Sequence, residues 1–373
     1  MSDAEEAATS VRRAIETASQ GLVERRELVE LVALSAVARS HLLVIGPPGT
    51  AKSEAVRRIS RALGGDYFEY LLGRFTEPSE IFGPVDLAKL REGVVETETS
   101  GMLPEAEIAF LDEIFQGSTA ILNTLLGLLN ERVFRRGHTR MDVPLRVCVG
   151  ASNSLPNDES LAAFADRFLV HVFVEPVGST RLEELLDEGW NLDDTPPSSD
   201  ASIAQLDTLA DAARGVEMDG ARTGLADAVR ELRGAGIELS DRRIVRAQRL
   251  LAAACVLDGR TEADERDLWP LVYAVPARDQ QEVARDVLRD RLEPSRNDAL
   301  GASAEDASRG PAARADRLAR TARALLDDAP DAPQAEWLLE LEAVVREIDA
   351  SLSPEQLPEG LGELREQMTD ILE

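Results

Sequence analysis

The residues best suited to chemistry lie in the stretch 41–58, where an apolar run is followed by a short loop and then by residues at helical spacing. The loop contains two glycines and a lysine and reads Gly46, Pro47, Pro48, Gly49, Thr50, Ala51, Lys52 and Ser53. A glycine turn between a strand and a helix directs backbone N–H groups and the helix dipole at one point, which favours a phosphate group. In such a loop Lys52 would reach the β- and γ-phosphates and Ser53 would ligate Mg²⁺. The stretch therefore predicts a nucleotide-phosphate loop.

One position departs from the strict phosphate-loop pattern, which has glycine directly before the lysine. Here that residue is Ala51, so the assignment depends on the strand and the helix on either side. A plain Gly/Pro turn before a helix is the alternative. Lys52 is one of only two lysines in the chain, the other being Lys89, and its place in this loop favours phosphate binding.

Two carboxylates follow an apolar run about sixty residues after the loop: residues 108–111 precede Asp112 and Glu113. In an open parallel sheet, ligands bind at the carboxyl ends of the strands. We expect Asp112 to hold Mg²⁺ through its water shell and Glu113 to polarise the water that attacks the γ-phosphate. An apolar run before Asp-Glu is common, and its position after the phosphate loop gives it this meaning.

Asn153 and Arg167 are further candidates because of the elements that they follow. Asn153 comes just after a predicted strand at 145–150, and its amide could orient the attacking water, although a capping role is the alternative. Arg167 lies between a predicted helix at 159–164 and a predicted strand at 169–174. At that helix end it would have no phosphate of its own subunit in reach, so it could serve a neighbour's nucleotide.

The elements that must position these residues form an α/β unit. The remaining strands are predicted at 41–45 and 67–72, and the remaining helices at 3–20, 25–39 and 118–130. Between the first two helices, Leu22 and Val23 lie where backbone and apolar side chains would hold an adenine ring. Residues 75–84 form a loop with a short helix, and residues 93–101 a hairpin.

A second hairpin is predicted at 132–143 around Gly137. It concentrates basic groups in a chain that is otherwise acidic: Arg132, Arg135, Arg136, His138 and Arg140. These side chains would face a pore or a partner, or they would simply belong to a solvated hairpin. The pattern leaves both interpretations open.

After a predicted helix at 178–190 and a linker at 191–200, the pattern becomes helical. Four helices are predicted at 202–213, 220–233, 241–256 and 261–275, and these form a lid. The third begins after Ser240 or Asp241, so an arginine near its start could turn back to the nucleotide. The chain continues with a helix at 279–293, a loose polar segment at 294–310 and helices at 312–326, 335–348 and 354–372.

Composition bounds the class of protein. With 373 residues, of which 44% are hydrophobic, the chain is long enough for two domains and a tail. It has no run of eighteen apolar residues and no signal-peptide pattern, so we expect a cytoplasmic protein. Two cysteines and three histidines without ligand spacing predict neither a disulfide framework nor a metal cage. A net charge of −28 argues against a general nucleic-acid-binding surface.

Taken together, these motifs resemble the MoxR group of AAA+ ATPases. The resemblance rests on residues 46–53, 110–114, 123–132, 151–153 and 166–168, and on the two insertions. Segments most similar to the RavA branch of that group are 74–76, 80–84, 100–106 and 240–243. The resemblance covers roughly residues 10–290.

The resemblance implies an AAA+ core over residues 1–190, with a five-stranded parallel sheet covered by helices on both faces. It also implies a helix-2 insert at about 84–103, a pre-sensor-1 hairpin at about 132–143, a linker at 191–200, an all-α lid at 201–293 and a helical extension at 294–373. The tail departs from the RavA branch, which carries a larger C-terminal module. The subunits would form a ring, usually a hexamer, with ATP and Mg²⁺ between them.

In that ring the resemblance assigns a role to each candidate residue. Lys52, Ser53, Asp112, Glu113 and Asn153 would act in their own subunit. Arg167 would be supplied to the neighbour, and Arg242, or else Arg243, would be a second sensor. The leading hypothesis is a chaperone-like ATPase that remodels a protein partner, usually one with a von Willebrand factor A domain. A nucleic-acid motor and a nucleotide-gated scaffold are the alternatives.

Overall fold

The computed structural model describes residues 3–178, 181–191, 201–308, 318–319, 321–323, 325–326, 335–351 and 358–372. Five strands form one parallel sheet in the order β2-β3-β6-β1-β7. These strands are β1 (Leu42–Ile45), β2 (Tyr67–Leu71), β3 (Ile108–Asp112), β6 (Val147–Ser152) and β7 (Val170–Phe173). The prediction of an α/β fold with a five-stranded parallel sheet is confirmed.

Helices cover both faces of this sheet. One face carries α1 (Asp3–Ser19), α2 (Arg26–Val37) and α3 (Lys52–Leu63), and the other carries α6 (Thr119–Glu131) and α7 (Glu159–Ala165). Along β1, Leu42 and Val44 pack on the first side while Leu43 and Ile45 pack on the second. Because alternate residues of a strand face opposite sides and both sides are buried, the strand is apolar throughout.

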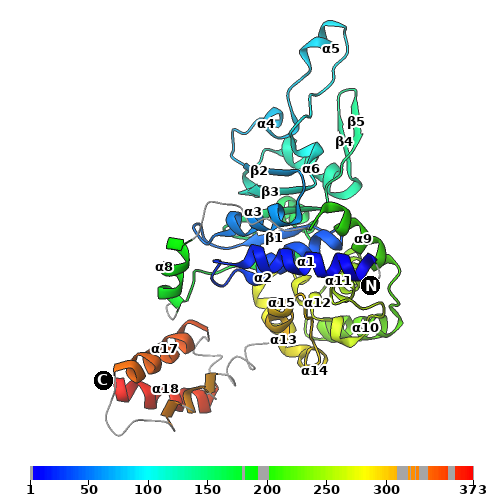
Figure 1. Ribbon diagram of the computed structural model, residues 1–373. Helices are drawn as coiled ribbons and strands as arrows, with labels where there is room; N and C mark the ends of the chain where they lie inside the picture. Colours follow the sequence, from blue (N-terminus) through cyan, green and yellow to red (C-terminus); the bar gives the residue numbers. More distant parts are fainter. Residues whose placement is uncertain are drawn as a thin grey trace.

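The two insertions project together from one end of the molecule (Figure 1). The second is the predicted hairpin, with β4 (Val133–Arg136) paired to β5 (Thr139–Asp142). The first contains α4 (Pro78–Phe82), α5 (Leu87–Arg91) and the 3-10 turn η1 (Leu103–Glu105). The hairpin predicted at 93–101 is wrong, since this segment makes a single isolated bridge from Thr97 to Val85. Just before it, the side chain of Asp86 accepts hydrogen bonds from the N–H groups of Ala88 and Lys89 and so caps α5.

The helical region after the sheet shares its apolar core with α1 and α2. It contains α9 (Ile203–Arg214), α10 (Asp219–Gly234), α11 (Asp241–Leu257), η4 (Glu265–Asp267), α12 (Pro270–Tyr273), α13 (Arg278–Val287) and α14 (Arg289–Leu292). The single helix predicted at 261–275 is therefore wrong. Pro270 has no N–H to continue a preceding helix, so it begins α12 instead. The helix predicted at 279–293 is likewise divided at Leu288.

Part of the segment predicted to be loose, 294–310, is the helix α15 (Gly301–Ser308), which packs on α2. The buried carboxylate of Glu30 accepts hydrogen bonds from the N–H groups of Ala302 at 3.3 Å and Ser303 at 2.8 Å. This carboxylate caps the helix at its positive end. The cap lies 273 positions away in sequence from Ser303, so no local pattern could reveal it.

Near the C-terminus, α17 (Ala335–Ser351) and α18 (Glu359–Leu372) pack on each other around Leu341, Leu361 and Met368. A further helix, α8 (Leu182–Asn191), follows β7. Most of the predicted linker at 191–200 and parts of the helices predicted at 312–326 and 354–372 lie outside the described residues. None of the described helices is both long and apolar enough to cross a lipid bilayer.

Candidate functional site

The predicted site residues gather where three neighbouring strands end. Leu111 of β3 is opposite Gly150 of β6, and Ile45 of β1 is opposite Ser152 of β6. Because the strands are parallel, Asp112, Asn153 and the loop that begins at Gly46 emerge from the same edge of the sheet. We call this the carboxyl edge. Residues distant in sequence thus meet at the place predicted for ligand binding.

The backbone of the phosphate loop requires or favours glycine at three positions. A Cβ atom on Gly46 would lie 2.2 Å from the carbonyl oxygen of Val174, so glycine is required there. Gly49 has φ +80°, in the left-handed region. Ala51 also lies in this region, with φ 56°, which costs a residue with a Cβ about 1 kcal/mol. The residue that departs from the strict pattern is thus one for which the backbone favours glycine.

Lys52, the first residue of α3, is buried and turned into this loop. Its Nζ donates hydrogen bonds to the carbonyl oxygens of Gly46 and Pro47, both at 2.8 Å. Burial lowers its pKa, while the negative charges of Asp112 and Glu113 raise it. The ammonium group is therefore held among carbonyl oxygens, with the two predicted carboxylates near enough to act on it.

The start of α3 has the features that a phosphate group requires. No side chain caps this helix, and its first intrahelical hydrogen bond runs from the N–H of Ala55 to the carbonyl of Ala51 at 3.0 Å. The N–H groups of Lys52, Ser53 and Glu54 thus precede the helical ladder, at the positive end of the helix dipole. An uncapped helix start beside a buried lysine fits the phosphates of a nucleotide.

Glu113 and Asn153 contact each other directly, with the Asn153 Nδ2 donating to the Glu113 Oε1 at 2.8 Å. Glu113 has φ 48°, an unusual conformation for a residue with a side chain. Its N–H donates to the Oδ1 of Asp112 at 2.9 Å. The turn thus begins with a left-handed residue directly after Asp112, and the amide of Asn153 holds the carboxylate of that residue.

Arg167 lies at the opposite edge of the sheet. Val170, the first residue of β7, is opposite Leu42, the first residue of β1, so Arg167 belongs to what we call the amino edge. A four-residue strand separates this edge from the phosphate loop by on the order of 13 Å. Among the described residues, its Nε is buried without a hydrogen-bond partner. Within one subunit, Arg167 and Lys52 therefore lie at opposite edges of the sheet.

The two candidate sensors at the start of α11 differ sharply. Arg243 is 2% exposed and donates to the carbonyls of Ala274, Phe168 and Leu169. It also pairs with Asp166 at 3.0 Å, so its guanidinium holds the fold together. Arg242 is partly exposed and donates to the Oδ1 of Asn130. Both lie at the amino edge, so neither turns back to the phosphate loop of its own subunit.

Comparison with known proteins identifies the family. Residues 9–211 match the model described as the MoxR domain in the MoxR-vWA-beta-propeller ternary systems, and residues 225–287 match an AAA lid domain. The chain belongs to the MoxR family of AAA+ proteins. The match covers the sheet, the phosphate loop and both insertions.

MoxR relatives include proteins with and without a named role. An uncharacterized protein of Methanocaldococcus jannaschii is 36% identical over 248 residues, 66% of this chain and 66% of the relative. The chaperone MoxR1 of Mycobacterium tuberculosis is 26% identical over 204 residues, 54% of this chain and 52% of that protein. The chain thus spans about two thirds of the first relative and about half of the second.

The fold of this MoxR protein also occurs in a crystal structure of a candidate ATPase from Cytophaga hutchinsonii. The two structures superimpose with a TM-score of 0.64 at 14% sequence identity, over 79% of this chain and 97% of the other. At this identity the likeness is one of fold.

Arg25 holds the phosphate loop in place, a role that the sequence did not predict. It is 5% exposed, and its guanidinium donates to the carbonyl of Thr50 at 2.7 Å and to that of Glu175 at 2.6 Å. It therefore braces the phosphate loop against the segment after β7. The sequence shows only an arginine at the junction of a predicted loop and a predicted helix. The fold reveals that it is buried and which two carbonyl groups it contacts.

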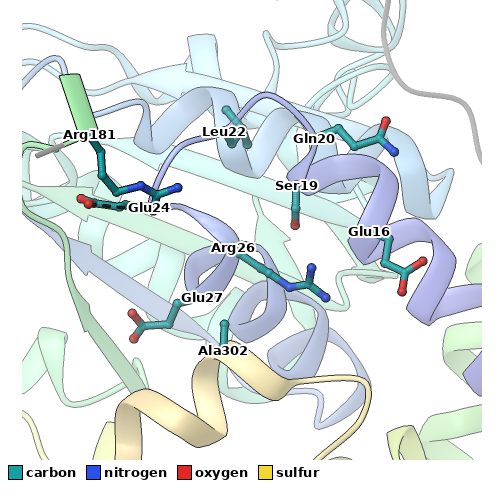
Figure 2. Close-up of a pocket in the computed structure, with 9 residues that line it drawn as sticks. All are labelled: Glu16, Ser19, Gln20, Leu22, Glu24, Arg26, Glu27, Arg181 and Ala302. Carbon is teal, nitrogen blue, oxygen red and sulfur yellow. Dashed lines mark ion pairs between the residues drawn. The ribbon is translucent and has the colours of Figure 1, made fainter. Parts of the chain in front are cut away.

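Leu22 and Val23 lie beside this brace. Val23 is buried, whereas Leu22 is half-buried and lines a pocket of about 520 Å³. Figure 2 shows Leu22 facing this pocket together with several charged side chains. No phosphate-loop residue lines it. The adenine contact assigned to Leu22 and Val23 stays a prediction.

Most basic side chains of the hairpin at 132–143 form hydrogen bonds or ion pairs with the chain itself. Arg132 donates to the carbonyls of Leu145 at 2.7 Å and Arg39 at 3.0 Å, and burial lowers its pKa to about 10. Arg136 donates to the carbonyl of Gly83 at 2.8 Å. Arg135 pairs with Glu131. His138 lies against the first insertion at the carbonyl of Val95, which leaves Arg140 as the exposed basic group without such a contact in the described chain.

Proposed function

We propose that the chain is an ATP hydrolase whose active site combines the carboxyl edge of one subunit with the amino edge of the next in a ring, usually a hexamer. The observation that carries this proposal is the contact of Asn153 with Glu113 beside Lys52, while Arg167 lies about one strand length away. The carboxyl edge would bind the nucleotide and position the water, and the amino edge would supply the arginine, so neither edge alone holds all the groups that phosphoryl transfer requires.

At the carboxyl edge, the loop from Gly46 to Ser53 would bind the phosphates through its N–H groups and Lys52. Leu22 and Val23 would contact the adenine. Ser53 and Asp112 would hold Mg²⁺, which when bound would neutralise charge on the phosphate oxygens. Glu113 would accept a hydrogen bond from the attacking water, and Asn153 would hold the carboxylate and that water in register.

At the amino edge, Arg167 would supply positive charge to the nucleotide of the neighbouring subunit. A guanidinium delivered in this way contributes about 10³ to 10⁵ in rate in comparable sites. Arg242 lies at the same edge, so we assign it a second sensing role toward the same neighbour. This differs from the expectation that it would turn back to its own nucleotide.

We further propose that hydrolysis remodels, activates or helps to mature a protein partner. Support comes from the chaperone name of a relative and from the matched family model, whose description couples MoxR to a von Willebrand factor A protein. Assignment to the RavA branch stays a prediction of the sequence motifs. The contacts of Arg132, Arg135 and Arg136 within the chain do not favour a nucleic-acid motor, and the intact pair Asp112 and Glu113 does not favour a scaffold without turnover.

Replacing the glutamate while keeping its shape tests the proposal. In Glu113→Gln, we expect ATP turnover to fall by about 10² to 10⁴, because the base is lost, while calorimetry with magnesium still detects ATP binding. Lys52→Ala serves as the comparison, since it should lose binding as well. Turnover that survives in Glu113→Gln would overturn the role given to this carboxylate.

A further inference from the structure

The apolar side chains of helix α8 are exposed rather than covered by the part of the chain that the structure describes. Every side chain from Leu182 to Trp190 is exposed, including Leu186 at 72% and Trp190 at 90%. An isolated helix of ten residues is marginal in water even with good helix formers. Something outside these contacts must therefore cover α8 if it is to persist as a helix.

The pattern of α8 specifies what that cover must offer. Leu182, Leu185, Leu186 and Trp190 recur at helical spacing, which gives one apolar stripe. The residues between them are mainly acidic and include Glu183, Glu184 and Glu188. A partner surface should combine exposed apolar groups with positive charge, which is uncommon in a chain with a net charge of −28.

The start of α11 offers this combination. Arg242, Val245, Arg246 and Arg249 recur at the spacing i, i+3, i+4 and i+7, so they share one face. Val245 is 63% exposed. Within the described residues, none of these arginines forms an ion pair with a carboxylate, although α11 belongs to a strongly acidic chain.

Helices α8 and α11 lie on opposite sides of the subunit. Figure 1 shows α8 at the left of the body and α11 toward the right, beneath the sheet. α8 follows the carboxyl end of β7 and is joined to the α1–α2 loop by the Gly178 N–H, which donates to Glu24 at 3.3 Å. The start of α11 is fixed to the amino edge through Arg243. The two surfaces therefore cannot meet within one subunit, and a contact between them requires subunits joined head to tail.

We propose that α8 of each subunit packs on the face of α11 formed by Arg242, Val245, Arg246 and Arg249 in the next subunit. The leucines and Trp190 would cover Val245 and the aliphatic stems of the arginines, and the glutamates would meet the guanidinium groups. This inference rests on the proposed function, because it uses the same two edges that form the shared ATP site. It adds to that site a helix–helix contact with a second copy of this chain.

Cross-linking tests this contact directly. We would mix Leu186→Cys subunits with Val245→Cys subunits of the full chain, add Mg·ATP and oxidise; both native cysteines, Cys148 and Cys255, are buried. We expect a covalent dimer in the mixture and none in either variant alone. Gly234→Cys, at an exposed and open position at the end of α10, replaces Val245→Cys as the control and should yield no dimer.

Sedimentation of the same samples separates two kinds of failure. Rings that form with Mg·ATP but give no cross-link, or that cross-link equally well through Gly234→Cys, would overturn the α8 contact and leave the shared ATP site standing. If no assembly forms at any nucleotide concentration, both proposals fail. The thiol of Leu186→Cys should also react rapidly with a maleimide in dilute subunits and at least tenfold more slowly after assembly. Protection already present in dilute subunits would mean that the chain covers α8 itself, which would contradict the proposal.

Exchange of charge gives an independent test. Glu183→Arg with Glu188→Arg in one subunit, or Arg246→Glu with Arg249→Glu, should each raise the concentration needed for assembly by about tenfold, since exposed pairs are individually weak. Combining all four changes should restore assembly toward that of the original chain. Failure of the combination to improve on either double variant would overturn the charge pairing.

Discussion

The two edges of the sheet differ in whether their polar side chains find hydrogen-bond partners within the subunit. At the carboxyl edge the groups satisfy one another: Lys52 donates to its own loop, and Asn153 donates to Glu113. At the amino edge the Nε of Arg167 is buried and has no hydrogen-bond partner in the described part of the chain. The groups at the carboxyl edge are thus paired without a ligand. At the amino edge Arg243 is also paired, but Arg167 keeps an unpaired donor within the described residues. This contrast is the physical reason to look for the missing partner of Arg167 in a neighbour.

Loss of Arg167 should have the largest effect. In Arg167→Ala we expect ATP turnover to fall by about 10³ or more, while ATP binding to each subunit stays nearly unchanged, because the arginine serves a different subunit's site. Steady-state hydrolysis and calorimetry measure the two quantities. Arg140→Ala is the matched control, since Arg140 is exposed on the hairpin. A large loss of nucleotide affinity in Arg167→Ala would contradict the assignment of nucleotide binding to the carboxyl edge alone.

A pair of adjacent arginines sharpens the contrast within the amino edge. Arg243→Ala should lower the free energy of unfolding by about 3 kcal/mol, because three carbonyls and Asp166 lose a buried partner. Arg242→Ala should change it by less than about 0.5 kcal/mol and lower turnover instead. Thermal denaturation and hydrolysis assays separate the two. Equal destabilisation by both variants would contradict the structural role given to Arg243 alone.

Glu27, in the first turn of α2, should make the folding stability of the protein sensitive to pH. Burial, and then the charge of Asp306, raises the pKa of Glu27 to about 8. The folded state thus keeps a proton that the unfolded chain releases above its usual pKa near 4.5. Stability should fall as pH rises from about 5 to about 8.

Thermal denaturation across this range should show a decrease in Tm of a few degrees for the original chain. In Glu27→Gln the decrease should be smaller, because the proton can no longer be lost. A decrease at least as steep in the variant would mean that another group, such as Glu30, whose pKa burial also raises, controls the effect.

The smallest expected effect concerns the strain in the phosphate loop. Ala51→Gly should raise the free energy of unfolding by up to about 1 kcal/mol, since φ 56° suits glycine better than alanine. Gly49→Ala, at φ +80° with open space around it, should lower it by a similar amount. Denaturant unfolding of the two variants measures both. A destabilising Ala51→Gly would show that the alanine methyl contributes packing that outweighs the strain.

Much of the carboxyl edge could be predicted because its residues directly follow apolar strands. Asp112, Asn153 and the loop at Gly46 were expected at strand ends, and parallel strands necessarily bring such ends together. Their hydrogen bonds could not be predicted, since the contact between Asn153 and Glu113 depends on the strained backbone of Glu113 and on the strand order.

Other features depended on contacts between distant segments. The cap that Glu30 provides for α15 joins residues at opposite ends of the chain, and the carbonyl partners of Arg25 come from two separate loops. Motif similarity favoured Arg242 over Arg243 as the second sensor. Adjacent residues on a helix point in different directions, so only the fold reveals that Arg243 is the buried one. Proline at position 270 was a visible signal for the break in the helix predicted at 261–275.

Complementation between two inactive variants tests the central claim most directly. Arg167→Ala subunits retain a complete carboxyl edge, and Lys52→Ala subunits retain a complete amino edge. If active sites are shared, mixing them over a range of ratios should give ATP turnover clearly above that of either parent, with a maximum at intermediate ratios. Turnover that never exceeds the weighted sum of the two parents, in mixtures shown by sedimentation to form joint rings, would contradict the account.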